Sequence, residues 1–173
     1  MQILENEGQW QSEYQNGWLT HFQQTGECNW KIYNRPKNSQ ALPGHGIDLS
    51  QSRLVLITSA GSFLADSQPP YDAAHPLGDY TIRTYPTSAS LDALAIAQDH
   101  YDHSAVNADR QVLIPLRHLE DMVAEGLIGE LTENVISFHG YQPDVTRTIS
   151  ETATKVVEAA KKEKAKAALL VPA

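Results

Sequence analysis

The sequence predicts an α/β fold in which helices flank a largely parallel sheet. Short apolar or β-branched runs recur along the chain, and helical patterns lie between the later ones, as in folds built from alternating strands and helices. The runs cover residues 53–58, 81–85, 94–97, 112–114, 135–138 and 167–171. The first run, Arg53-Leu-Val-Leu-Ile-Thr58, is continuously apolar between polar flanks, which is typical of a strand buried on both faces. The expected layering is Rossmann-like or flavodoxin-like.

Two apolar stripes predict the helices of this domain. Leu116, Leu119, Val123 and Leu127 share one helical face, and Gly126 and Gly129 follow as stop signals. A second stripe runs from Ile149 to Ala160, with Thr148 and Ser150 available as caps. We therefore expect an α/β domain over residues 48–173.

The first 47 residues predict an arm or lid on this domain. Trp10, Tyr14 and Trp18 recur at four-residue spacing, which places them on one face of a helix. Packing is the favoured role for these three rings, and ligand contact is the alternative. Residues 34–46 are rich in Asn, Pro and Gly and read as an extended loop.

Composition and charge limit the functions to consider. Apolar residues make up 41% of the chain, charged residues 20%, and the formal net charge is −8. We expect no nucleic-acid binding, because phosphate contacts need clustered Lys and Arg. No apolar stretch reaches the roughly 20 residues of a membrane span, and the start lacks a signal-peptide pattern. With Cys28 as its single cysteine, the chain is expected to be cytoplasmic and without an internal disulfide.

Three strand ends carry residues suited to binding. The first strand runs into Thr58-Ser59-Ala60-Gly61-Ser62, whose amides could cradle an anion. The strand at Val135 ends in Phe138-His139-Gly140-Tyr141, and the last strand ends in Val171-Pro172-Ala173. Ligands of open parallel sheets bind beyond the carboxyl ends of the strands, so this edge is the predicted site.

The densest group of polar residues is Asp99-His100-Tyr101-Asp102-His103. Such a run can ligate a metal, serve as general acid and base, or form a structural turn network, and all three remain open. The run overlaps part of a zinc-hydrolase pattern, but Gln98 stands where that pattern needs its first histidine. No residue is assigned as a metal ligand.

The order of these motifs resembles one family. The motifs are Ser59-Ala60-Gly61, Asp66-x-Gln68-Pro-Pro-Tyr-Asp72, Asp99-His-Tyr-Asp-His103, Phe138-His-Gly-Tyr141 and Leu169-Leu-Val-Pro172. From Asp48 to Ala173 the chain is similar to the selenoprotein B subunit of glycine, sarcosine and betaine reductases, and to its relative in D-proline reductase.

The resemblance implies a reductase that cleaves the C–N bond of a small amine substrate. A pyruvoyl group on a partner subunit holds the substrate in such enzymes, a selenocysteine or cysteine attacks it, and a thiol or selenol carrier protein takes part. The implied substrate-binding residues are Ser59, Gly61, Asp66, Gln68, His139 and Tyr141. The implied catalytic residues are His100, Asp102 and His103, with His100 or His103 as proton donor to the leaving amine.

The family's selenocysteine or cysteine would directly follow Ala173. We therefore expect the next codon to be UGA read as a stop; a natural truncation completed by another chain is the alternative. On this interpretation the chain is a subunit or fragment that is inactive alone and forms a homo-oligomer through its open sheet. The competing functions are a metal-dependent hydrolase built on His100, Asp102 and His103, and a non-catalytic oligomerising interaction domain.

Overall fold

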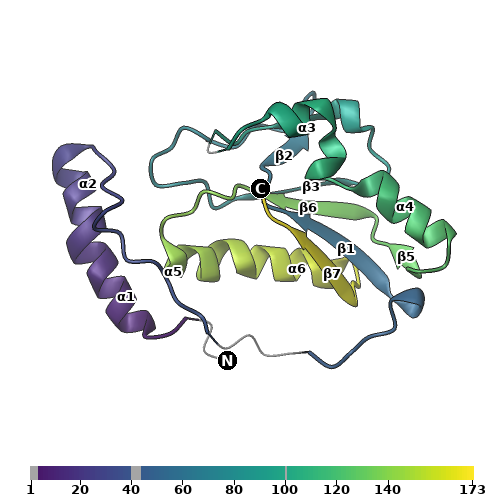
Figure 1. Cartoon of the computed structure of the whole chain (residues 1–173), viewed down its shortest axis with the longest axis horizontal. Coiled ribbons are helices and arrows are strands. Elements are labelled where there is room, and N and C mark those ends of the chain that lie inside the picture. Colours follow the sequence, from purple (N-terminus) through teal and green to yellow (C-terminus); the bar gives the residue numbers. More distant parts are fainter. Residues whose placement is uncertain (1–3, 40–43, 100) are drawn as a thin grey trace. The chain divides into compact units, whose positions relative to one another are not determined.

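The computed structural model describes residues 4–39, 44–99 and 101–173 (Figure 1). The chain divides into two compact units. The first unit comprises Met1–His45 together with Asp144–Thr146, and the second comprises Gly46–Pro143 and Arg147–Ala173. The predicted lid function of the N-terminal segment stays a prediction.

A five-stranded sheet forms the centre of the second unit. Strand β1 (Arg53–Thr58) pairs in parallel with β7 (Ala167–Val171), from Leu54 to Thr58. It also pairs in parallel with β5 (Glu130–Leu131) and β6 (Asn134–Phe138). Because Ile57 pairs with both β6 and β7, these two strands lie on opposite sides of β1. Strand β3 (Ile82–Pro86) adds to β6 in the antiparallel sense. The predicted α/β fold with a largely parallel sheet is confirmed.

The alternation of side chains along β1 distributes the core over both faces of the sheet. Leu54 and Leu56 belong to the larger cluster, which includes residues of α4 (Leu116–Ala124). Val55 and Ile57 face the other way and pack with apolar residues of α6 (Thr154–Lys162). Figure 1 shows α6 running along the sheet. A strand with helices on both faces has no solvated side, which explains its continuous apolar run.

A small antiparallel ladder lies beside the main sheet. Strand β2 (Ser62–Leu64) pairs with β4 (Leu94–Ile96), and η3 (Leu91–Ala93) precedes β4. The sequence predicted the second of these strands and missed the first. Gly61 lies between β1 and β2 at a φ of 66°, and the chain turns there within the small polar segment Thr58–Ser62.

The strand expected at residues 112–114 is wrong. Arg110–Val112 forms the 3₁₀ helix η4, after α3 (Ser104–Ala108), and the Asp109 side chain accepts a hydrogen bond from the Gln111 N–H at its start. Leu113 and Ile114 are buried, whereas Val112 is 54% exposed. The apolar run thus fills the core from a turn, and periodicity over three residues cannot distinguish this from a short strand.

The last helix begins earlier than expected. Helices α5 (Val145–Arg147), η5 (Thr148–Ala153) and α6 are consecutive, and η5 is a π-helical turn. Thr148 and Ser150 therefore lie inside the helix, and the prediction that they cap it is wrong. Asp144 takes that role, because its carboxylate accepts from the N–H and hydroxyl of Thr146. The stop predicted after α4 is confirmed, since Gly126 adopts a φ of 73°.

The first unit is organised by a ladder of aromatic rings. Helices α1 (Glu7–Glu13), η1 (Tyr14–Leu19) and α2 (Thr20–Thr25) are consecutive. Trp10 stacks on Tyr14 and Tyr14 on Trp18, with ring centroids 5.1 and 5.6 Å apart. All three rings are buried, and Tyr33 meets each of them edge-on. The predicted packing role of these aromatics is confirmed.

No helix in the described part of the chain combines the length and apolar character needed to cross a membrane.

Candidate functional site

The ends of three parallel strands meet at Ser59. The Ser59 N–H donates to the carbonyl of Val171, at 3.1 Å, and its hydroxyl oxygen accepts from the N–H of Ala173 at 2.9 Å. On the other side of β1, the Gly61 N–H donates to the carbonyl of Phe138 at 2.9 Å. The predicted convergence of these strand ends on one edge is confirmed. We call the group formed by residues 58–62, 138–141 and 171–173 the strand-end cluster.

Two glycines allow close backbone contacts within the strand-end cluster. A Cβ atom on Gly61 would lie 2.5 Å from the carbonyl oxygen of Ala97, and one on Gly140 would lie 3.0 Å from that of Ser59. The same Cβ on Gly140 would be 3.2 Å from Nε2 of Gln98. These contacts bring the segment after β4 against the ends of β1 and β6. The loop containing the predicted catalytic residues therefore starts at the strand-end cluster.

The proposed amide cradle after β1 is not available. Ser59 and Gly61 donate to Val171 and Phe138, as described above. The Ala60 N–H donates to the Thr58 hydroxyl at 3.2 Å, and the Ser62 N–H donates to the Ser137 hydroxyl at 2.9 Å. Because all four amides bind groups of the protein, an anion would have to displace an existing hydrogen bond. A ligand would therefore contact Ser59 through its hydroxyl or carbonyl group, and Gly61 through its carbonyl group.

His139 is fully buried in the strand-end cluster. Its Nδ1 atom lies 3.2 Å from the carbonyl oxygen of Tyr141, and its ring lies 6.4 Å from that of Tyr141. The Tyr71 ring lies 6.2 Å away on the loop after β2. The Tyr141 hydroxyl donates to the carbonyl of Pro76, which fixes the ring. The structure therefore brings His139 and Tyr141 together with Gly61, whose ideal Cβ would lie 3.5 Å from the His139 ring.

Three buried hydroxyl groups connect β2, β3 and β6 next to the strand-end cluster. The Ser62 hydroxyl lies 2.8 Å from that of Tyr85 and donates to that of Ser137 at 3.0 Å, and all three residues are fully buried. Burial raises the pKa of Tyr85 to about 12, although the bond to Ser62 opposes this. Tyr71 donates to the carbonyl of Ser137 at 2.8 Å, and burial raises its pKa as well. Both phenols are therefore neutral donors at physiological pH and act as structural supports.

The loop of predicted catalytic residues is only partly described. His100 lies outside the described residues. His103 hydrogen-bonds through Nε2 to the carbonyl oxygen of Gln98, and its ring lies 4.5 Å from that of Tyr101. Asp102 accepts from the N–H and hydroxyl of Ser104 at the start of α3, and these bonds lower its pKa. Asp102 thus holds the turn that leads into α3, and its catalytic role stays a prediction.

Asp66 and Gln68 follow the far end of β2. Gln68 accepts from the Leu64 N–H and donates to the Thr84 carbonyl, at 2.9 and 2.8 Å, so its amide joins β2 to β3. Asp66 is exposed. Ser62 starts β2 at the strand-end cluster, and the two residues to Leu64 carry the chain about 7 Å along. Among the described contacts none connects Asp66 or Gln68 with the cluster, and their substrate-binding role stays a prediction.

Gln98 and Tyr71 lie at the strand-end cluster and were not among the predicted site residues. Gln98 is 3% exposed, and its carbonyl binds His103 while its amide lies against Gly140. Its position directly before Asp99 was the one available signal. Tyr71 stood in a recognised motif, but its distance of 66 residues from Ser137 hid their contact.

No group of three His, Cys, Asp or Glu side chains able to hold a metal occurs among residues 4–39, 44–99 and 101–173. Because His100 is outside these ranges, the hydrolase alternative built on it stays open.

Comparison with known proteins identifies relatives. The family model described as glycine/sarcosine/betaine reductase selenoprotein B matches residues 29–173. The chain is also similar to the D-proline reductase subunit gamma of Acetoanaerobium sticklandii, with 28% identity over 124 residues. The alignment covers 71% of this chain and 49% of the relative, so the chain spans about half the relative's length. No solved structure matches.

Proposed function

This chain belongs to the glycine/sarcosine/betaine reductase selenoprotein B family, and from that premise we propose that it supplies the substrate-side pocket for reductive cleavage of a C–N bond. The substrate would be a small amine. The pocket would be the strand-end cluster, with His139 and Tyr141 on one side and the loop ending at His103 on the other. Ser59, Gly61, Asp66 and Gln68 complete the proposed substrate-binding set.

The observation that carries this proposal is the hydrogen bond from the Ala173 N–H to the Ser59 hydroxyl. It fixes the backbone that leads out of β7 against the turn after β1. A selenocysteine or cysteine following Ala173 in the full-length protein would therefore start from a held position beside His139 and Gly140. Such a residue would supply the nucleophile for C–N cleavage, as a selenolate or thiolate.

The residues of this chain would handle the proton and the substrate's orientation. A leaving amine needs a proton, and histidine can donate one near neutral pH. We propose His100 or His103 for this role, with Asp102 holding the start of α3 in place. The bond between His103 and Gln98 supports the assignment, because it ties the imidazole to a residue that contacts Gly140.

The proposed reaction needs partners. A pyruvoyl group on a partner subunit would hold the amine, and a thiol or selenol carrier protein would complete the thiol–disulfide chemistry. We further propose that the chain is cytoplasmic. We also propose that it is inactive alone, because the proposed reaction needs a pyruvoyl group on a partner subunit.

The nucleotide sequence after the Ala173 codon tests the proposal directly. An in-frame UGA, followed by a frame that continues the family's pattern, is the expected result. A different stop codon with no continuing homologous frame would contradict the selenocysteine assignment. The full-length protein should then be purified with its pyruvoyl-bearing partner and assayed with dithiothreitol, for amine release from glycine, sarcosine and betaine and for ring opening of D-proline. The matched control replaces the residue after Ala173 by serine, which should abolish turnover without affecting folding.

We also propose that the chain forms a homo-oligomer through β7. This strand pairs with β1 on one side, and no described strand pairs with its other side. Leu170 is 65% exposed and Leu169 36% exposed, on opposite faces of the strand. An apolar edge strand of this kind favours pairing with another chain.

A further inference from the structure

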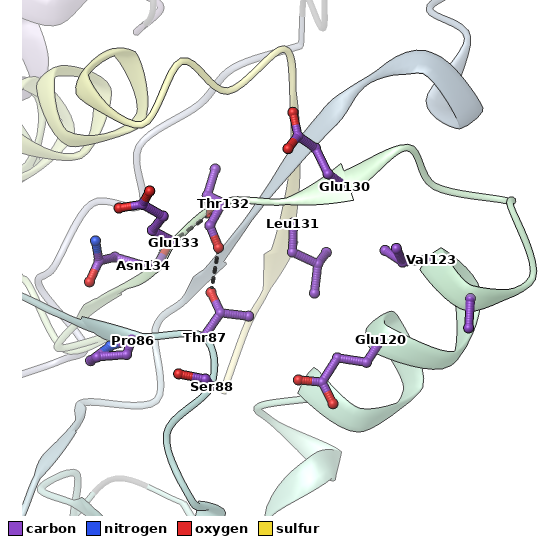
Figure 2. A pocket seen from close by; sticks show the side chains of 11 residues that line it. Pro86, Thr87, Ser88, Glu120, Val123, Glu130, Leu131, Thr132, Glu133 and Asn134 are labelled. Carbon is purple, nitrogen blue, oxygen red and sulfur yellow. Dashed lines mark hydrogen bonds between the residues drawn. The ribbon is translucent and has the colours of Figure 1, made fainter.

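A second cavity lies at the opposite edge of the sheet from the strand-end cluster. It has a volume of about 740 Å³ and lies among the end of β3, strand β5 and the C-terminal half of α4. Figure 2 shows the side chains of Glu120 and Val123 reaching from α4 toward Thr87, Ser88 and Leu131. The volume is within the ~300–1,000 Å³ typical of ligand sites. We call this space the β5 groove.

The backbone of Leu131 faces the β5 groove without a strand partner. Glu130 and Thr132 donate to the carbonyls of Ser52 and Leu54, so they pair with β1. Alternation along the strand turns the N–H and carbonyl of Leu131 to the other side. Strand β3 would continue the ladder there, but its last pair with β6 is Pro86 with Asn134.

The chain leaves the sheet directly after this pair. The Thr87 N–H still donates to the Glu133 carbonyl, but the Ala89 N–H donates back to the Pro86 carbonyl in a turn. No described residue completes the ladder at Leu131. One position of the sheet is therefore left open inside an apolar groove, which is the arrangement that accepts an added strand.

The charge of the β5 groove limits what can bind. Its lining includes Glu120, Glu130 and Glu133 and has no Lys, Arg or His among the described residues. Glu130 and Glu120 form ion pairs with Arg53 and Arg117, at 2.8 and 2.7 Å. Glu133 has no ion-pair partner among the described side chains. Figure 2 shows the Glu120 carboxylate extending toward Ser88, while the carboxylates of Glu130 and Glu133 point away from Leu131. A basic ligand complements this surface.

We propose that the β5 groove binds a short extended segment of a partner protein in which basic and apolar residues alternate. The segment would pair its backbone with Leu131. Alternation would place one apolar side chain against Leu131 and Val123, and the flanking basic side chains beside the glutamates. This site is separate from the proposed reductase pocket and does not depend on it.

Fluorescence anisotropy with the full chain tests the proposal. The probe is a labelled pentapeptide of alternating lysine and valine, and the controls are the same peptide with glutamate for lysine and one N-methylated at alternate amides. The lysine peptide should bind saturably, and more weakly as salt is raised. The N-methylated peptide should bind at least about tenfold more weakly, because it cannot pair with Leu131.

Two arginine variants of α4 locate the site. Ala124 is exposed and lines the β5 groove, so Ala124→Arg should fill it and weaken binding at least about tenfold. Met122→Arg adds the same charge outside the lining and should leave binding unchanged. Glu120→Gln should weaken binding roughly three- to tenfold.

Three outcomes would overturn the proposal. Equal binding of the N-methylated peptide would show that charge alone attracts it. Equal loss in Ala124→Arg and Met122→Arg would show that the net charge of α4 is responsible. A change of Ala124→Arg from oligomer to monomer, with no binding of the lysine peptide to wild type, would identify the groove as an interface between copies.

Discussion

The Ser59 hydroxyl accepts a hydrogen bond from the Ala173 N–H across the ends of two parallel strands, with 2.9 Å between the oxygen and nitrogen. The Ser59 N–H also donates to Val171, so this one residue holds the end of β7 by two bonds. The position of the backbone at Ala173 therefore depends on this serine.

Ser59→Ala in the full-length protein should therefore misplace the proposed nucleophile. We expect kcat/KM to fall about tenfold and the free energy of unfolding to fall by about 1 kcal/mol, from the lost hydrogen bond. Amine-release kinetics and urea unfolding measure the two effects. Ser67→Ala removes an exposed hydroxyl outside the cluster and should match wild type. An unchanged kcat/KM in Ser59→Ala would remove Ser59 from the proposed pocket.

His100→Ala and His103→Ala test the proton donor. Loss of a general acid typically costs 10²–10⁴-fold, so we expect at least one variant to lose about 100-fold in kcat. The measurement is turnover of the full-length protein with its partner subunit. His118→Ala on the exposed face of α4 is the control and should be unaffected. Wild-type turnover in both His100→Ala and His103→Ala refutes the assignment.

Gly61→Ala should destabilise the second unit far more than Gly126→Ala. Both glycines have a positive φ, 66° and 73°, but the added Cβ meets the Ala97 carbonyl at 2.5 Å only at Gly61. A Cβ at Gly126 would meet no described atom within 4 Å outside the two adjacent residues. We expect a loss of about 2–4 kcal/mol at Gly61 from strain and overpacking, and about 1 kcal/mol at Gly126 from strain alone. Urea midpoints for the pair measure the difference, and equal losses would contradict the close approach.

The free energy of unfolding should fall as the pH rises above 10, because Tyr85 then ionises in the unfolded chain while it stays neutral in the folded protein. The pKa of Tyr85 is raised to about 12 by burial, whereas the pKa of a tyrosine in the unfolded chain is near the ordinary value of 10.0. The neutral phenol is thus favoured in the folded protein. Its stabilising contribution is complete below pH 10 and is lost as pH rises toward 12, at up to about 1.4 kcal/mol per pH unit. Tyr85→Phe should make the decline measured by urea unfolding shallower; a curve parallel to wild type would count against this.

Leu170→Lys should dissociate the proposed oligomer, because it places a charge on the exposed edge strand. Val157→Lys is a suitable control, since Val157 is 49% exposed on α6 and does not belong to β7. Light scattering should show a smaller species for Leu170→Lys only. A strictly monomeric wild type at high concentration would refute oligomerisation of this chain.

The parts of the fold that follow from local pattern were predictable from sequence. The apolar run of β1, the stripe of α4 and the four-residue aromatic spacing each describe a buried surface directly. The strand predicted at residues 112–114 was wrong because three consecutive apolar residues can be buried in a turn as well as in a strand. Strand β2 was missed because it has three residues and begins directly after the Gly61 turn.

Only those parts of the candidate site that follow from the order and direction of the strands were predictable from sequence. Parallel strands bring their carboxyl ends to one edge, so Ser59 and His139 could be placed together in advance. The amide cradle failed because β6 and β7 supply acceptors that only the tertiary structure reveals. Tyr71 and Gln98 could not be assigned, since their contacts join segments that no sequence period relates.

Gly140 limits the substitutions that the strand-end cluster can accept. Its missing side chain leaves room for both the Ser59 carbonyl and the Gln98 amide. A larger residue at position 140 would meet the Ser59 carbonyl, which every residue at position 59 carries, so replacing the Ser59 side chain cannot make room for it. A library that randomises position 140 should therefore yield mostly glycine among its folded variants, even when positions 59 and 98 are randomised with it.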